Sequence, residues 1–100
     1  MTKIKKYVED IAEELDSAKQ YMEIALEYKA TGNNARYAKY KDMSVQELGH
    51  AMTLHEFAAQ DIEQLKAVYP DIPQDMLDKW KHAHVDYVEK AAWIKQMQSM

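Results

Sequence analysis

Apolar residues recur every three or four positions along most of the chain, which is the spacing of one face of an α-helix. In the first third of the sequence this stripe consists of Ile4, Val8, Ile11, Leu15, Ala18, Met22 and Ala25. It predicts a helix from about Lys3 to Ala30. The next letters, ATGNN, contain a glycine typical of a helix end and asparagines typical of a helix start. So short a connection predicts an antiparallel hairpin.

The second predicted helix runs from about Ala35 to Tyr69, where the prolines of YPDIP end it because proline cannot continue a helix. Two stripes run along it. The first reads Tyr40, Met43, Glu47, His50, Leu54, Phe57, Asp61, Leu65 and Val68. The second reads Val45, Leu48, Met52, His55, Ala59 and Ile62. A helix that is apolar on two sides is normally covered on two sides, which favours a partner chain.

A third helix is predicted from Gln74 to Gln98. One of its faces carries Leu77, Trp80, His84, Tyr87, Ala91 and Ile94. The 100 residues contain no linker and only two glycines and two prolines, so few positions interrupt helices. The sequence therefore predicts a single all-α domain over residues 1–100, a long antiparallel hairpin with a third helix.

Composition narrows the classes of function. Hydrophobic residues make up 47% of the chain and charged residues 30%, as in folded proteins. The net charge is −4 and the 13 basic residues are scattered, which argues against nucleic acid as a partner. The N-terminus lacks the apolar region of a signal peptide, and no stretch approaches the roughly 18 apolar residues of a membrane span. We therefore expect a cytoplasmic protein with no membrane partner.

Glu47 and His50 interrupt the first stripe of the second helix. Burying a lone carboxylate is costly unless it is paired or binds a metal ion. Residues three apart share a helical face, so this Glu-x-x-His pair can direct an oxygen and a nitrogen at one ion. In the predicted hairpin, Glu14 of the first helix lies at about the same level. The chain has no cysteine, and carboxylate with imidazole suits iron or manganese, with zinc as an alternative.

These features resemble the first helical hairpin of the ferritin-like superfamily, above all its rubrerythrin and bacterioferritin branches. The likeness covers about residues 10–58, half of the chain. It includes a glutamate on the first helix, a tyrosine seven residues later, and a Glu-x-x-His followed by alanine on the second helix. The residues that carry it are Glu14, Ala18, Tyr21, Ala25 and the segment ARYAKYKDMSVQELGHA.

The resemblance implies a di-iron centre in which Glu14 is a terminal ligand, Glu47 a bridging carboxylate and His50 an imidazole ligand. It also implies that Tyr21 lies beside the metals as a hydrogen-bonding or redox neighbour. The usual work of the family is the oxidation of ferrous iron by oxygen or peroxide, for storage, detoxification or peroxide reduction. A ferroxidase or a peroxide-reducing oxidoreductase is therefore the kind of enzyme to expect, if the protein is an enzyme.

The chain departs from the family in having no second Glu-x-x-His and no fourth helix. Two arrangements remain open. Two hairpins could dimerise into a four-helix bundle with a symmetric site, as in the half-length encapsulated ferritins, within a homodimer or a higher homo-oligomer. Alternatively, the third helix could complete the site with His84, Asp86 or Glu89.

A different class of function also remains open. The protein could be a non-enzymatic helical interaction or structural protein, of the kind a phage or mobile element encodes, whose ferritin-like hairpin no longer binds metal. The absence of a fourth helix favours this alternative.

Overall fold

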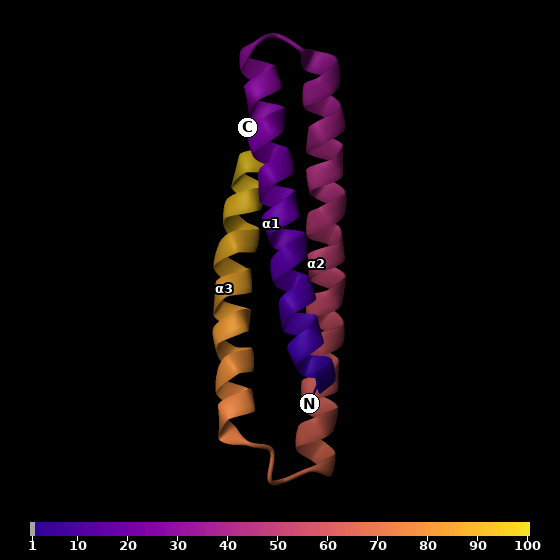
Figure 1. The fold of residues 1–100 in the computed structure, drawn as a ribbon, viewed down its shortest axis with the longest axis vertical. Helices are drawn as coiled ribbons and strands as arrows, with labels where there is room; N and C mark the ends of the chain where they lie inside the picture. Colours follow the sequence, from indigo (N-terminus) through magenta and orange to yellow (C-terminus); the bar gives the residue numbers. More distant parts are fainter. Residues whose placement is uncertain (1) are drawn as a thin grey trace.

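The computed structural model describes residues 2–100, and within this range it contains three helices and no strand. They are α1 (Thr2–Ala30), α2 (Asn34–Val68) and α3 (Gln74–Gln98). The molecule is a rod with extents of 56 × 18 × 16 Å (Figure 1). The all-α prediction is confirmed, and each helix begins and ends within one residue of the predicted position. Assembly into a four-helix bundle stays a prediction.

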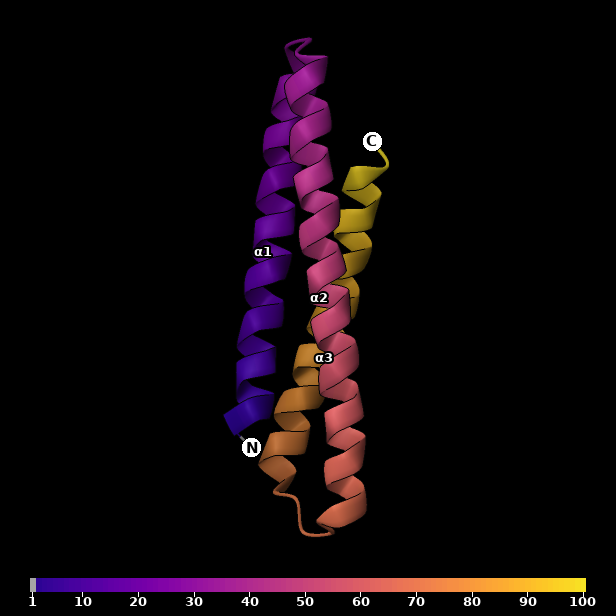
Figure 2. The same cartoon turned by 90° about the vertical axis from the view of Figure 1, so that its right-hand side faces the viewer.

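Local chemistry accounts for the hairpin between α1 and α2. Gly32 has a φ of +82°, a left-handed conformation that glycine adopts without a Cβ clash. The side chain of Asn33 then accepts a hydrogen bond of 3.1 Å from the backbone N–H of Arg36, which caps α2. The two helices consequently run antiparallel and side by side, as both views show (Figures 1 and 2).

The core lies along the seam between α1 and α2. Large apolar residues of α1, such as Leu15 and Met22, are buried against α2. From α2, however, the buried residues are mostly small: Ser44, Leu48, Ala51, Ala58 and Ile62. A chain region that contributes alanine and serine to a core lets the neighbouring helix approach closely.

The first apolar stripe predicted for α2 therefore forms only part of the core. Met43, Phe57 and Val68 of that stripe have 39%, 47% and 67% of their surface exposed. The buried face lies between the two predicted stripes and includes Leu48 and Ile62 of the second one, while the small residues there provide the close contact. Hydrophobicity alone does not identify them, since serine and alanine score low however well they pack.

Helix α3 packs mainly on α1 and makes fewer contacts with α2. Its anchors are Ala91, Ile94 and Met97, all buried. One polar junction joins all three helices. The buried hydroxyl of Ser44 donates to the carbonyl of Ala18 at 2.7 Å and accepts from Nε2 of Gln98 at 3.0 Å. This junction places the C-terminal end of α3 against the hairpin.

Within residues 2–100, no helix combines the length and apolar character that a membrane crossing requires.

Replacing Ile94 with alanine should destabilise the protein by about 2–4 kcal/mol, because Ile94 is only 1% exposed and its removal leaves a cavity between α3 and the hairpin. Thermal unfolding followed by circular dichroism measures the loss. Val88→Ala on the same helix is the control, since Val88 is 50% exposed and its loss should change stability by less than about 0.5 kcal/mol. Equal effects of the two substitutions would contradict the described docking of α3.

Candidate metal centre

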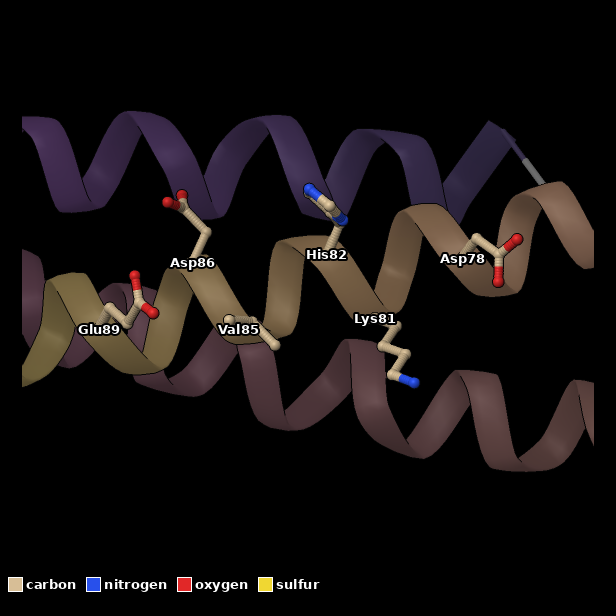
Figure 3. A pocket seen from close by; sticks show the side chains of 6 residues that line it. All are labelled: Asp78, Lys81, His82, Val85, Asp86 and Glu89. Atoms are coloured by element: carbon tan, nitrogen blue, oxygen red, sulfur yellow. The ribbon is translucent and has the colours of Figure 1, made fainter.

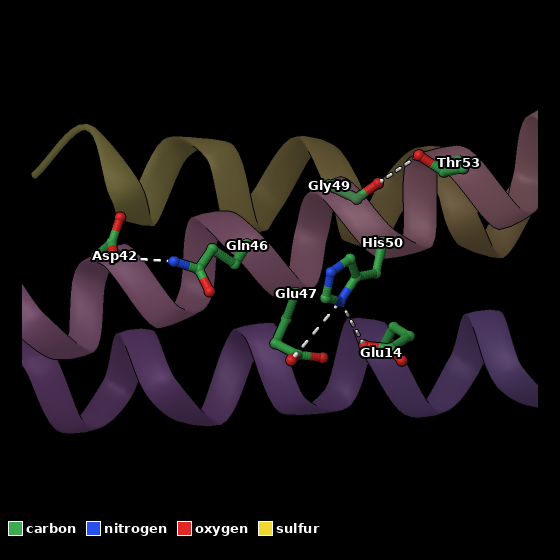
Figure 4. A network of polar contacts seen from close by, with 7 residues as sticks. All are labelled: Glu14, Asp42, Gln46, Glu47, Gly49, His50 and Thr53. Atoms are coloured by element: carbon green, nitrogen blue, oxygen red, sulfur yellow. Dashed lines mark hydrogen bonds and ion pairs between the residues drawn. The ribbon is translucent and has the colours of Figure 1, made fainter.

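Glu14 of α1 and Glu47 and His50 of α2 come together on one side of the hairpin (Figure 4). Nδ1 of His50 lies 3.7 Å from Oε2 of Glu14 and 3.8 Å from Oε1 of Glu47. Each residue offers a ligand atom, and the three atoms lie within 4.8 Å of one another. We call these residues the triad. The structure thus brings together the three potential ligands that the sequence predicted.

Two structural facts produce this convergence. The Glu-x-x-His spacing places both α2 residues on one helical face. The tight turn at Gly32 then sets the antiparallel register that brings Glu14 to their level. The same register places Nζ of Lys3 in α1 3.2 Å from Oδ2 of Asp61 in α2, so this carboxylate of the first stripe has a lysine partner.

The triad is accessible from solvent. The side chains of Glu14 and Glu47 are 29% and 26% exposed, whereas that of His50 is 62% exposed. The carboxylates thus lie in the seam and the imidazole lies at its rim. In Figure 4, α3 passes behind α2 and away from the side chains of the triad. An ion could therefore reach all three side chains from the face that α3 leaves uncovered.

Glu14 is electrostatically unsatisfied in the absence of a cation. Its Oε2 is buried and has no hydrogen-bond partner within the described residues. Its pKa is raised above the usual value, first by the adjacent Glu47 carboxyl group and then by burial. His50 lowers the pKa of Glu14 but does not offset these effects. Two neighbouring carboxylates whose negative charges repel each other are a donor set that a divalent cation would neutralise.

Tyr21, the candidate catalytic neighbour, lies about two helical turns from Glu14 on α1. It follows Glu14 by seven residues, and Tyr40, which precedes Glu47 by seven, lies opposite it. The two rings are 6.3 Å apart between centroids. Tyr28 stacks on the other side of Tyr40 at 5.6 Å. Tyr21 and Tyr40 thus lie at about the same distance from the triad, in an aromatic row that continues through Tyr28 toward the turn.

The structure does not bring the α3 candidates to the triad. His84 lies against His55 of α2, with 2.8 Å between Nδ1 of His84 and Nε2 of His55. Asp86 and Glu89 line an open groove of about 510 Å³ on the surface of α3, together with His82 (Figure 3). Within residues 2–100, the triad is the one group in which three or more histidine, aspartate or glutamate side chains bring ligand atoms together.

The pairing of His55 with His84 is a feature that sequence reasoning missed. His55 was expected in a core or interface, and its ring indeed stacks on Tyr87 with 4.0 Å between centroids and 7° between planes. Burial, and then the neighbouring His84, lower the pKa of His55. The sequence places each of the two histidines in an otherwise apolar stripe, one on α2 and one on α3. It does not indicate that these two stripes face each other.

The donor set of the triad fits a first-row divalent cation. Carboxylates are hard ligands and imidazole is a borderline one, and iron, manganese and zinc accept both kinds. Three protein ligands leave coordination positions open, as reactive metal sites require.

No family model matches the chain, and no curated protein or solved structure is significantly similar to it.

Glu14→Gln should raise the unfolding midpoint of the metal-free protein at pH 7. Because the pKa of Glu14 is higher in the folded state than in the unfolded state, the folded chain becomes less stable as pH rises through the interval between the two values. Above this interval the folded protein carries the full loss of stability that comes from the charge on Glu14. The neutral amide of glutamine has no such charge, so the loss is removed. Below the pKa of an unfolded glutamate, about 4.3, the substitution should have little effect.

The matched control is Glu13→Gln, which changes an exposed neighbour on α1 and should leave the midpoint unchanged at both pH values. A lower midpoint for Glu14→Gln at pH 7 would show that the Glu14 carboxylate is already well paired in the metal-free protein.

Proposed function

We propose that this protein binds ferrous iron through Glu14, Glu47 and His50 and promotes its oxidation by dioxygen or peroxide, for iron storage or detoxification. The observation that carries the proposal is the convergence of the three ligand atoms within 4.8 Å at an accessible face. The unpartnered Oε2 of Glu14 supports it, since a bound cation would satisfy this buried oxygen. The ferritin-like resemblance of the hairpin points to the same chemistry.

A second copy of the chain would complete the centre by supplying a second triad. Met43, His50 and Phe57 are spaced by seven residues and so occupy one face of α2. Met43 and Phe57 are 39% and 47% exposed, which places apolar side chains on both sides of the triad. Two such faces packed about a two-fold axis would bury these side chains. They would also bring two triads together in a four-helix bundle with four carboxylates and two imidazoles.

The ligands have distinct roles in this proposal. Iron binds the ionised form of Glu14, whose pKa is raised, so loading of iron favours release of a proton from Glu14. The carboxylates stabilise the ferric product more than the ferrous substrate, because their negative charge is attracted more strongly to the ion of higher charge. Each ferrous ion gives up one electron, and dioxygen or peroxide accepts it. The rim position of His50 leaves a route for iron and oxidant.

An anaerobic titration of metal-stripped protein with Fe(II), followed by admission of air, tests the proposal. We expect saturation near one iron per chain and then a rise in near-ultraviolet absorbance as ferric iron forms. Glu47→Ala and His50→Ala should each weaken binding by about tenfold or more and abolish the oxidation, since outright loss of a ligand exceeds the 10–100-fold effect of losing a supporting residue. Mn(II) and Zn(II) titrations establish which metal binds most tightly.

His82→Ala serves as the control, because this exposed histidine of α3 lies in the groove of Figure 3 and is not part of the triad. Absence of saturable binding by the unaltered chain would overturn the proposal. The triad would then be a structural polar cluster, and the exposed apolar face of α2 would favour the alternative of a helical interaction protein.

Association through the triad face should depend on Phe57. We expect a species of twice 11.7 kDa in light scattering when iron is present. Phe57→Glu should weaken dimerisation by more than about tenfold, because the new carboxylate would be buried without a partner. Val85→Glu changes an equally exposed apolar residue of α3 and should leave association intact. A monomer under all conditions, or equal effects of both variants, would contradict the proposed interface.

A further inference from the structure

The molecule holds a second group of converging ligand atoms, the imidazole nitrogens of His55 and His84, on the opposite side of α2 from the triad. We propose that His55 and His84 form a separate metal site that links α2 to α3 and takes a late first-row divalent cation, copper(II) or nickel(II) in preference to zinc. The site does not depend on the iron chemistry proposed above, because it shares no residue with the triad.

The position of the two histidines separates the sites. His55 follows His50 by five residues, which turns its side chain by about 140° around the axis of α2. His50 therefore faces the uncovered side of the hairpin, while His55 faces α3. The partner, His84, comes from α3 and lies 29 residues further along the chain. A cation held by both would cross-link two helices that otherwise share few contacts.

The ligand atoms indicate the class of metal. Nε2 of His55 and Nδ1 of His84 are 2.8 Å apart and are joined by a hydrogen bond, so a cation would replace the proton between them and the two rings would turn toward it. Imidazole nitrogens are ligands that late first-row divalent cations accept. For a given nitrogen site, the affinity rises through nickel(II) to a maximum at copper(II) and falls again at zinc.

The surroundings hold one ligand in place and leave the other accessible. The His55 ring stacks on Tyr87 and lies 5.3 Å from the centroid of Trp80, so it has little rotational freedom. His84 is exposed, and its ring is 5.0 Å from that of His55. A cation can thus approach from the side of His84. In the metal-free protein the same nitrogen atoms are joined by a hydrogen bond, which the cation would replace.

The test is a calorimetric titration of the untagged full-length chain with copper(II) and nickel(II), in a background of Glu47→Ala and His50→Ala that disables the triad. We expect one equivalent of metal to bind and to raise the unfolding midpoint, because the ion binds only where α2 and α3 are packed together. Electron paramagnetic resonance of the copper form should resolve two coordinating nitrogens.

Two variants and one control identify the ligands. His84→Ala should weaken binding by at least about tenfold. His55→Phe should do the same while preserving an aromatic ring against Tyr87, so that a loss of binding is not a loss of folding. His82→Ala, two residues from His84 on α3, should bind as tightly as the background protein.

The proposal is overturned if the background protein binds no metal, if His55→Phe binds as tightly as the background, or if the copper spectrum shows a single nitrogen. The last two results would mean that exposed histidines bind metal individually. Because the triad is disabled throughout, each of these outcomes is independent of whether the unaltered chain binds iron at the triad.

Discussion

Helices α1 and α2 pack closely because small side chains, among them Ala18, Ser44 and Ala51, occupy the seam where they meet. The seam is tight enough for the hydroxyl of Ser44 to reach a backbone carbonyl of α1 at 2.7 Å. A seam of this kind permits little sliding, since each small residue has a specific counterpart. The register that follows from it places Glu14 level with Glu47, and Lys3 level with Asp61.

Helix α2 consequently carries polar side chains beside apolar ones on two of its flanks. Toward the uncovered side it presents the Glu47 carboxylate and the His50 imidazole beside Met43 and Phe57, and toward α3 it presents His55 against two aromatic rings. Met43 and Phe57, which a simple helical stripe would bury, are exposed. The buried face between these flanks consists mostly of small residues, together with Leu48 and Ile62. The two chemically distinct sites are kept apart by the body of the helix itself.

The helices and the triad were predictable because their causes are local or nearly so. Proline, glycine and asparagine end and cap the helices, and a three-residue connection leaves the hairpin little choice of register. The location of α3 was not predictable, since its apolar face fits either flank of the hairpin equally well by hydrophobicity. The contact between His55 and His84 depends on that location. The packing role of Ser44 was hidden for another reason, because a lone serine carries no periodic signal.

All three residues of the triad belong to the hairpin, and none belongs to α3. During synthesis the ribosome completes the hairpin while α3 is still being added, and contacts between neighbouring helices joined by a short turn are the kind that form fastest. The ligand cluster can therefore assemble on the nascent chain before its last helix exists. Docking of α3 then comes as a later step, which covers one flank of the hairpin and leaves the ligand-bearing flank open.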